Sequence, residues 1–219
     1  MLMKTSKTMI YHLRTKYGLK HFLDESSIPA NPFALFESWM NSAIKEKVTE
    51  PNAMNFSTVN KKGMPSSRVV LLRGFDKNGF VFYTNYHSRK ANDLKVNPRA
   101  CVTFYWQKLE KQVRIEGKIK KVLKHVSDEY FGSRPRMSQV SAWASEQSRV
   151  LESREELDRI VENLTNKYKG KKIPRPAHWG GYCLVPISFE FWQGRPDRLH
   201  DRILYKKTKD SWKINRLFP

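Results

Sequence analysis

The chain has 219 residues, of which 39% are hydrophobic and 12% aromatic, which suits one domain with a real core and excludes a disordered chain. No stretch reaches the roughly 18 apolar residues that a membrane helix needs. The formal net charge of +20 favours anionic partners, namely nucleic acid, acidic lipid or phosphorylated small molecules. Because the basic residues are dispersed over the whole chain, a basic arm dedicated to nucleic acid is disfavoured.

The N-terminal part divides into an arm and a capped helix. Residues 1–30 are polar and mixed, with a short helical piece expected near residues 11–17. Asn31 followed by Pro32 is typical of a helix cap and a first helical residue, and apolar residues at helical spacing extend this helix to about residue 47. We therefore expect a mobile arm over residues 1–30 and a single domain over residues 31–219.

From residue 53 onward the apolar period becomes alternating, and tight-turn sequences separate the runs. In residues 112–120, Val113, Ile115 and Ile119 face one way and polar or charged residues face the other. Strands are predicted at residues 54–59, 67–72, 80–84, 100–106, 112–120 and 181–192, with a final hairpin at 203–205 and 212–217. Helices are predicted at residues 88–96, 127–133, 138–146 and 153–168. This pattern predicts a mainly β fold of the α+β kind, a small barrel with peripheral helices.

Cysteine and histidine usage predicts neither a disulfide nor a metal centre. Cys101 and Cys183 are the only cysteines, and both stand in apolar runs, so we expect buried free thiols. No CxxC, HExxH or His/Cys cluster occurs. The first residues lack the long apolar core of a signal peptide, and a cytoplasmic location is expected.

Two segments place basic groups where a phosphate could bind. Arg68 and Arg73 flank an apolar strand, which is either a strand with charged ends or a pair of guanidinium groups aimed at phosphate oxygens. Ser88, Arg89 and Lys90 begin a predicted helix directly after a strand. Helix N-termini attract phosphate, and basic residues there oppose the helix dipole, which slightly favours an anion site over a capped surface helix.

Two further segments carry weaker signals. Residues 130–138 and 143–148 bring hydroxyl, amide and arginine groups near predicted helix ends, which suggests a second anion pocket or ordinary surface residues. Residues 190–202 leave an apolar strand, turn, and present three arginines and His200, which suits either a cleft or a solvated basic loop. Since no Gly-rich phosphate loop occurs, a nucleotide-like cofactor would be bound by strands and side chains.

Together these segments resemble one family, the FMN-dependent pyridoxine/pyridoxamine 5′-phosphate oxidases, over residues 32–219. The motifs that carry the resemblance are RVVLLR at 68–73, FYTN at 82–85, SRK at 88–90, QVRIEG at 112–117, SDEYF at 127–131, RP at 134–135, AWAS-x-QS at 142–148, EFWQG at 190–194, RLHDR at 198–202 and RL-x-P at 216–219. Each motif alone is weak, but their order over this length is specific. A weaker similarity to the family occurs at Arg14 and Tyr17.

The resemblance implies an FMN-binding split β-barrel that works as a homodimer with FMN at the interface. It implies a pyridoxal 5′-phosphate synthase, an oxidase of vitamin B6 biosynthesis and salvage. Such an enzyme converts pyridoxine 5′-phosphate or pyridoxamine 5′-phosphate to pyridoxal 5′-phosphate with O2 and releases H2O2. Neither a specific nucleic acid nor a membrane is implied as a partner.

The resemblance also implies roles for individual residues. The catalytic positions correspond to Arg198 and His200. The FMN-binding positions correspond to Arg68, Val69, Val70, Leu71, Leu72, Arg73, Tyr83, Thr84, Arg89, Lys90, Gln112, Gln147, Ser148, Trp192 and Arg202. The substrate-binding positions correspond to Arg73, Tyr130, Arg134, Ser138, Arg198, Leu199 and His200, with Arg14 and Tyr17 in a segment that can cover the site. The family usually has lysine where this chain has Arg73, so the charge is kept but a planar fork replaces a compact ammonium.

Two alternatives remain beside the oxidase. The first is a nucleic-acid-binding module, in which interleaved aromatic and basic residues at 104–108 form a stacking platform, although the same residues fit a core strand. The second is a split-barrel flavoprotein with another task, such as a flavin reductase or an FMN carrier. Oxidation of pyridoxine 5′-phosphate separates this second alternative from the oxidase.

Overall fold

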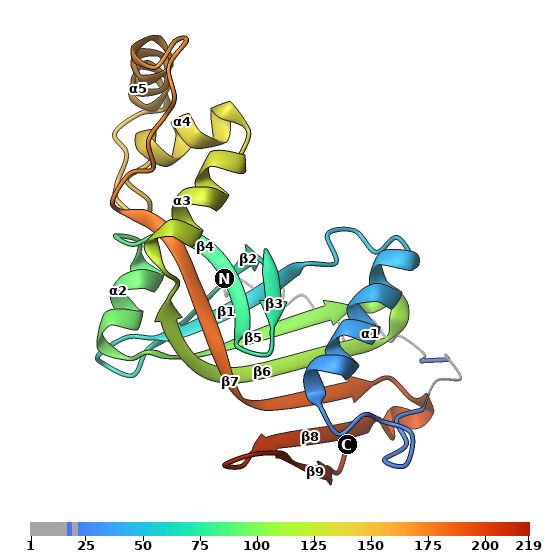
Figure 1. The fold of residues 1–219 in the computed structure, drawn as a ribbon. Helices are drawn as coiled ribbons and strands as arrows, with labels where there is room; N and C mark the ends of the chain where they lie inside the picture. The colour runs from blue at the N-terminus through green and yellow to red at the C-terminus, as the bar shows by residue number, and fades with distance from the viewer. Residues whose placement is uncertain (1–16, 19–21) are drawn as a thin grey trace, which may run out of the picture.

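The computed structural model describes residues 17–18 and 22–219, and their core is one curled antiparallel sheet (Figure 1). The strand order is β2-β1-β5-β6-β7-β4-β3, with β8 paired to β7 and β9 paired to β8. The nine strands found among these residues are β1 (Ala53–Val59), β2 (Pro65–Leu71), β3 (Gly74–Asp76), β4 (Gly79–Asn85), β5 (Arg99–Trp106), β6 (Lys111–Lys121), β7 (Trp179–Gln193), β8 (Asp201–Lys207) and β9 (Trp212–Arg216). The prediction of a mainly β fold is confirmed.

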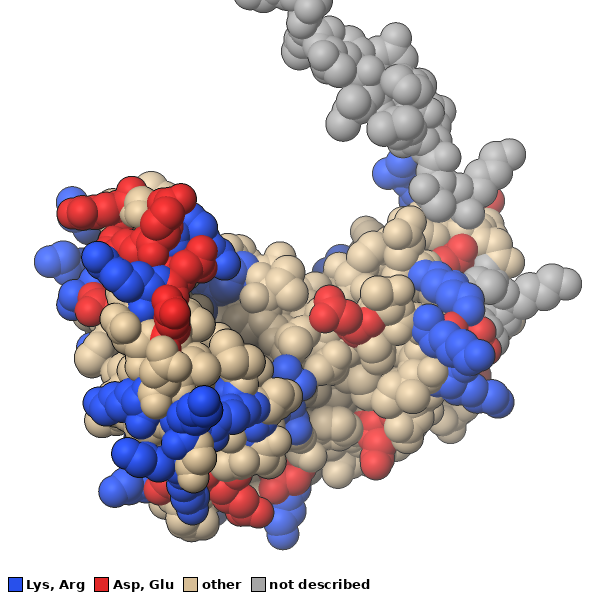
Figure 2. Space-filling model, turned by 90° about the horizontal axis from the view of Figure 1, so that it is seen from above, with Lys and Arg blue, Asp and Glu red and all other residues tan. Residues whose placement is uncertain are grey.

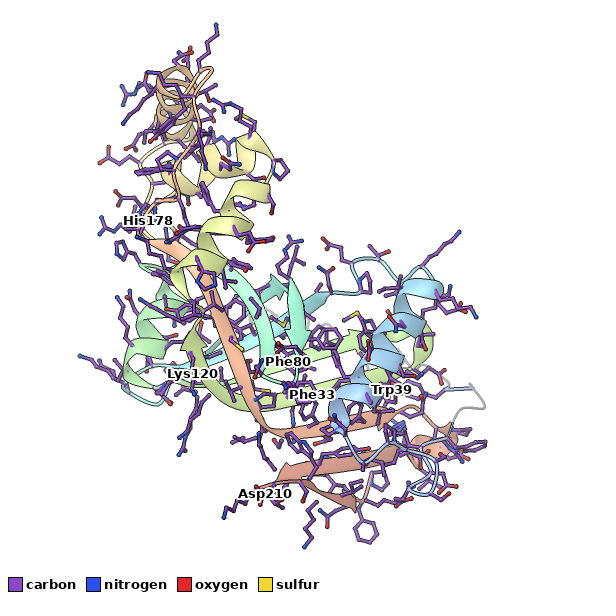
Figure 3. The ribbon with its side chains drawn as sticks, in the orientation of Figure 1. Phe33, Trp39, Phe80, Lys120, His178 and Asp210 are labelled. Carbon is purple, nitrogen blue, oxygen red and sulfur yellow. The ribbon has the colours of Figure 1, made fainter. Side chains whose placement is uncertain are left out.

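Helix α1 (Pro32–Lys45) covers the inner face of the sheet. Its predicted cap is present, since the side chain of Asn31 accepts a hydrogen bond from the Phe33 N–H at 3.0 Å. The Phe33 ring stacks on Phe80 of β4 with 5.6 Å between centroids (Figure 3). Phe36 and Trp39 are buried beside it. Each fully buried aromatic contributes about 1.5–3 kcal/mol, so α1 and the sheet form the main core.

Strand β7 is the longest strand and connects the two ends of the molecule. Halfway along, its pairing with β6 shifts register between Glu116 and Gly117, and the strand bends there (Figure 1). Glycine is required at position 117 because a Cβ would lie 2.2 Å from the carbonyl oxygen of Val185. The first half of β7 pairs with β4 and the second half pairs with β8.

A second, smaller core lies where β7 begins. Helices α3 (Lys124–Ser133), α4 (Arg136–Ala144) and α5 (Arg154–Lys167) gather there (Figure 1). Phe131, Val140, Ile173 and Trp179 are buried in this core, while α5 contributes only half-buried apolar residues. Helix α2 (Arg89–Val96) lies against β1 near this end of the sheet.

Several sequence predictions need correction. Strand β3 was not predicted, because three residues are too few to show an alternating pattern. Helices α3 and α4 begin three and two residues earlier than predicted. Cys101 and Cys183 are free but half-buried rather than buried, and burial raises the pKa of both thiols. Within the described part of the chain, no helix combines the length and apolarity needed to cross a bilayer.

The excess positive charge is spread over the surface. Figure 2 shows Lys and Arg in several separate groups with Asp and Glu among them. Residues 1–16 and 19–21, which include much of the predicted arm, lie outside the described residues. The boundary between arm and domain therefore stays a prediction, although Leu23 is buried and the carbonyl of Pro29 accepts a hydrogen bond from the Tyr205 hydroxyl at 2.9 Å.

Candidate functional site

A cavity of about 680 Å³ lies where β2 and β4 meet the starts of α2 and β7 and the ends of α3 and α4. Five cationic side chains line it, and none of the described lining residues is acidic. Thirteen lining residues were predicted as site residues: Arg68, Val69, Val70, Leu71, Arg73, Tyr83, Thr84, Arg89, Lys90, Tyr130, Arg134, Gln147 and Ser148. A concentration of cations without carboxylates is the charge pattern of a site for anions.

Arg68 is fixed in this cavity by neutral oxygen atoms. Its Nη1 donates to Thr58 Oγ1 at 2.8 Å and to the Phe56 carbonyl at 3.2 Å, and its Nη2 donates to Ser66 Oγ at 2.6 Å. The Thr58 hydroxyl in turn donates to the buried carboxylate of Asp93 at 2.7 Å. Burial lowers the pKa of Arg68, and the negative charge of Asp93 partly opposes this. The guanidinium is thus oriented without a direct carboxylate partner.

Lys90 is the second cation and is buried. Its ammonium donates to Thr84 Oγ1 at 3.1 Å, to Ser88 Oγ at 3.3 Å and to Gln147 Oε1 at 3.0 Å. Burial, with a smaller contribution from the positive charge of Arg68, lowers the pKa of Lys90 to about 8. A buried ammonium with only neutral partners and another cation nearby is destabilising unless an anion joins it.

The loop after α4 closes one side of the cavity. Gln147 Oε1 accepts from both Lys90 and Thr84, and the Asn85 side chain donates to the Ser145 carbonyl at 3.1 Å. Ser148 has a φ of 77°, a left-handed conformation that is uncommon for residues other than glycine. Such backbone strain is found often at ligand sites, where surrounding contacts hold it.

Tyr130 of α3 and Arg134, the residue directly after this helix, face the cavity from its other side. The Tyr130 ring stacks on Tyr83 with 3.9 Å between centroids, and the Arg134 guanidinium lies 4.6 Å from the centre of the Trp179 ring. Arg134 Nη1 is buried and has no hydrogen-bond partner among the described residues. Burial also lowers the pKa of Arg134, and the nearby charge of Arg73 adds to this effect.

A second group of predicted site residues surrounds the β7–β8 turn. The Trp192 and His200 rings lie 4.6 Å apart, and the Tyr17 ring contacts both edge-on at 5.5 Å and 5.1 Å. In the turn, Asp197 and Arg198 have φ values of 55° and 62°, so two consecutive residues are left-handed. We name Tyr17, Gln112, Trp192 and residues 198–202 the tail cluster.

The tail cluster is oriented by its own polar contacts. His200 Nδ1 accepts the backbone N–H of Arg195 at 3.1 Å, which leaves the proton of the neutral ring on Nε2. Burial and the charge of Arg198 lower the pKa of His200, so the neutral form is favoured at neutral pH. The buried carboxylate of Glu190 binds Arg202 Nε at 2.9 Å and Arg114 Nη2 at 2.6 Å.

The cavity and the tail cluster lie at opposite ends of β7. Trp179, the first residue of β7, lines the cavity, and Trp192, its second-to-last residue, belongs to the tail cluster. Thirteen residue steps at ~3.3 Å each correspond to roughly 43 Å along the strand. Figure 1 shows α3 and α4 at one end and the β7–β8 turn at the other. One chain does not bring the two groups together.

The structure separates the sequence-predicted residues into those that line the cavity and those that do not. Outside it lie Leu72, which is buried in the main core, Ser138 on α4, and the tail-cluster members Gln112, Trp192, Arg198, Leu199, His200, Arg202 and Tyr17. Arg14 lies outside the described residues. The lining residues that the prediction omitted are Ser66, Asn85, Ser141, Ala142, Ser145 and Trp179. Of these, Trp179 precedes the pair Gly180–Gly181, a signal of close packing that could have revealed it.

Comparison with known families gives two consecutive matches. Residues 40–168 match the family model described as pyridoxamine 5′-phosphate oxidase. The chain belongs to this family. Residues 179–219 match a second model, the pyridoxine 5′-phosphate oxidase C-terminal dimerisation region, which covers β7, β8 and β9. The resemblance inferred from the motifs is thereby confirmed.

Individual relatives agree with the family models. The chain is 51% identical over 215 residues to a pyridoxine/pyridoxamine 5′-phosphate oxidase of Burkholderia lata, with 97% of this chain and 100% of that protein covered. It is 49% identical over 214 residues to a protein of the same name from Paraburkholderia phytofirmans, with the same coverage of both chains.

Solved structures confirm the predicted split β-barrel. PhzG from Burkholderia lata, solved in complex with tetrahydrophenazine-1-carboxylic acid, has a TM-score of 0.87 at 31% identity and covers 92% of this chain and 99% of its own. An FMN-binding protein related to pyridoxamine 5′-phosphate oxidase, from Nostoc punctiforme, has a TM-score of 0.71 at 16% identity and covers 88% and 100%.

Proposed function

We propose that this protein is an FMN-dependent oxidase that converts pyridoxine 5′-phosphate or pyridoxamine 5′-phosphate to pyridoxal 5′-phosphate with O2, releasing H2O2, in the cytoplasm. The observation that carries the proposal is the cavity with five cations and no acidic residue among its described lining. FMN and the substrate each carry a phosphate, so the five cations of the cavity would bind two anionic groups. Membership of the family supports the same activity.

The residues of the cavity fit the phosphate of FMN. Lys90 has only neutral hydrogen-bond partners, Arg68 is oriented by neutral oxygen atoms, and Arg89 lies beside them at the start of α2. Together with the backbone N–H groups of the helix start, these side chains form a typical phosphate site. Gln147 and Ser148 contribute from the strained loop.

A second anion site, for the substrate phosphate, consists of Arg73, Tyr130 and Arg134, with Ser138 on the next helix. The buried and unpartnered Nη1 of Arg134 supports this, because a buried donor without an acceptor costs about 1–3 kcal/mol. Arg73 lies close enough to lower the pKa of Arg134, as expected of two cations that share one anion.

The tail cluster would complete the site from a second copy of the chain. One face of the sheet carries a row of paired residues that crosses six strands, from the exposed Val69 beside the cavity to Leu204 of β8. Glu190 and Arg114 stand in this row, next to Arg202. The match to a dimerisation region over residues 179–219 supports a homodimer that uses this face, with FMN at the interface.

The residues then have separate tasks. FMN, held by the cavity residues, would supply the redox chemistry between the substrate and O2. Arg198, Leu199 and His200 position the pyridine ring, while Gln112, Trp192 and Arg202 bind the flavin from the partner side. Because its Nδ1 accepts the Arg195 N–H, neutral His200 donates a hydrogen bond through Nε2 rather than acting as a base through Nδ1. Arg14 and Tyr17 would cover the bound substrate.

The decisive experiment is the visible spectrum of the purified protein without oxygen, before and after addition of pyridoxine 5′-phosphate. A flavin band that bleaches and returns on exposure to air is the expected result. Unphosphorylated pyridoxine is the matched control and should bleach the band far more slowly. A band that tetrahydrophenazine-1-carboxylic acid bleaches and pyridoxine 5′-phosphate does not would contradict the proposal in favour of a reaction on the ligand seen with PhzG.

A further inference from the structure

Trp179 is a cavity residue without an assigned role. It is buried, with 8% of its surface exposed, and it is the first residue of β7. Its backbone N–H donates to the Pro176 carbonyl at 3.0 Å, and its own carbonyl accepts from Arg175, whose guanidinium pairs with Asp128 of α3 at 2.6 Å. The backbone of Trp179 is therefore held in place at the start of β7 and connected through Arg175 to α3.

The rings of Trp179 and Tyr83 form a flat platform under α3. Their planes differ by 11° with centroids 5.4 Å apart. Gly181 makes this possible. A Cβ at Gly181 would lie 2.9 Å from the Tyr83 ring, which belongs to the residue paired with it on β4. Since no side chain rises from β7 at this position, the Tyr83 ring can lie across the strand.

Tyr130, in the last turn of α3, and Arg134, the residue that directly follows the helix, rest on this platform. Tyr130 stacks on Tyr83 with the planes 18° apart, and the Arg134 guanidinium lies over the Trp179 ring. One platform therefore contacts both side chains. A guanidinium on an indole face gains about 0.5–2 kcal/mol and keeps its planar fork in one orientation.

The orientation of the Arg134 guanidinium depends on these aromatic rings, because no carboxylate among the described residues pairs with it. No ion pair of Arg134 occurs among the described residues, and its Nη1 is buried and unpartnered. The aromatic faces of Trp179 and Phe131, at 4.6 Å and 5.9 Å from the guanidinium carbon, are its principal neighbours. A carboxylate there would neutralise the arginine, whereas an aromatic face orients it and leaves its charge available for an anion.

We propose that Trp179 is a positioning residue for the substrate phosphate, acting through Arg134, and thereby sets the preference for phosphorylated over unphosphorylated substrates. This inference rests on the proposed function, because it assumes that Arg134 binds the substrate phosphate. Trp179 does not act on the flavin phosphate, since Arg68, Arg89 and Lys90 lie on β2 and α2 and not on the platform.

The test compares Trp179→Leu with wild type, using 4-deoxypyridoxine 5′-phosphate, which lacks the oxidisable hydroxyl, as a calorimetric probe. The expected result is a dissociation constant raised roughly tenfold, within the range of a lost cation–π contact. Affinity for unphosphorylated 4-deoxypyridoxine and for FMN should not change. KM for pyridoxine 5′-phosphate should rise by the same factor while kcat changes less than twofold.

A double-mutant cycle with Arg134→Ala tests whether Trp179 affects probe affinity through Arg134. If Trp179 acts through Arg134, the Trp179 substitution has no further effect on probe affinity in an Arg134→Ala background. Trp179→Phe, which keeps an aromatic face, should recover part of the affinity and remains informative if the leucine variant does not fold. Trp143→Leu on α4 is the matched control, because its indole donates to the Pro174 carbonyl outside the cavity.

Other outcomes overturn the inference in recognisable ways. If affinity fell equally for the phosphorylated and unphosphorylated probes, or if affinity for FMN fell equally, Trp179 would only stabilise the fold. Additive effects in the cycle would mean that it does not act through Arg134. A wild type that does not bind the probe refutes the proposed function instead, and inorganic phosphate then replaces the probe in the same comparison. Unchanged phosphate affinity in Trp179→Leu, or no phosphate binding at all, removes the role of Trp179.

Discussion

The cavity and the tail cluster both contain arginines, yet these arginines differ in whether a carboxylate is their partner. In the cavity, Lys90 and Arg68 have neutral partners, and Arg134 has a buried nitrogen with none. In the tail cluster, Arg202 is paired with the buried carboxylate of Glu190. Near it, the Asp201 carboxylate lies 2.7 Å from Arg216 and 3.6 Å from Arg195.

This difference indicates which region binds the anions. A cation with a carboxylate partner is already neutralised, so its main contribution is shape and hydrogen bonding. A cation with only neutral partners keeps its charge for a ligand. We infer that the cavity supplies most of the binding free energy for both phosphates. Under the proposed function, the tail cluster would mainly position the rings, and it would do so from a second subunit.

The largest expected effect tests whether each site consists of the cavity of one subunit and the tail cluster of the other. We expect Arg134→Glu, which puts a negative charge in the cavity, and Arg198→Ala, which alters the tail cluster, each to lower turnover of pyridoxine 5′-phosphate at least 100-fold as homodimers. A heterodimer of the two variants, isolated with two different tags, has one site with both halves intact. Its activity should therefore be about half that of wild type.

The matched control reverses the arrangement. A chain that carries both substitutions is paired with a wild-type chain. If each site is shared, both sites of this heterodimer contain one altered half, and activity should be lost. If each chain instead held its own complete site, the double variant paired with wild type would retain half the activity and the first heterodimer would have none. The two heterodimers therefore give opposite results under the two arrangements.

An intermediate effect is expected from removing the most buried cation. Lys90→Met should weaken FMN binding roughly 10- to 150-fold, since a hydrogen bond to a charged group is worth about 1.5–3 kcal/mol. The same substitution should raise the melting temperature of the FMN-free protein, because a buried ammonium without an anion is removed. Weaker FMN binding together with lower stability of the FMN-free protein would contradict this account.

The pH dependence gives a second readout for Lys90. Its pKa is lowered to about 8 in the folded protein, so the charged form that binds phosphate decreases above pH 8, and FMN affinity should fall there. Between pH 8 and the ordinary lysine value of 10.5, the unfolded chain binds more protons than the folded one. Stability of the FMN-free protein should therefore rise with pH over that window. Both trends should be absent in Lys90→Met.

The sequence was sufficient for most of the fold and for naming most of the residues that line the cavity. The predicted cap at Asn31 and the alternation in β6 gave the element types correctly, because these signals are local. The motifs also named Arg68, Lys90 and Arg134 for the cavity. Local signals decided these predictions, and the structure changed mainly the ends of the elements.

The sequence was not sufficient to separate the two regions. A motif states which residues have a role, but not that the tail cluster lies at the far end of β7 from the cavity. Trp179 was missed because its proposed role depends on Gly181, on Tyr83 of another strand and on Arg134 at the end of α3. Contacts of this kind arise only from tertiary packing, which no local pattern records.

The smallest effect is expected from Glu190→Gln, which alters the ion-pair partner of Arg202 in the tail cluster. This change keeps the shape of the side chain but removes the charge that binds Arg202 and Arg114. Because Arg202 keeps a hydrogen bond to the Phe218 carbonyl at 2.8 Å, it should lose orientation rather than position. FMN affinity should fall about threefold to tenfold, since hydrogen bonds to charged groups are worth a few kcal/mol and only part is lost.

Glu116→Gln is the matched control for this prediction. Glu116 lies on the same face of the sheet and is 3.6 Å from Arg114, but it is exposed, and exposed ion pairs contribute only about 0–1 kcal/mol. FMN affinity of this variant should equal that of wild type. If FMN affinity were also unchanged in Glu190→Gln, the ion pair with Glu190 would not contribute to FMN binding by orienting Arg202. If it instead had an effect as large as Lys90→Met, the tail cluster would bind the phosphate as strongly as the cavity does, and the distinction between the two regions would be wrong.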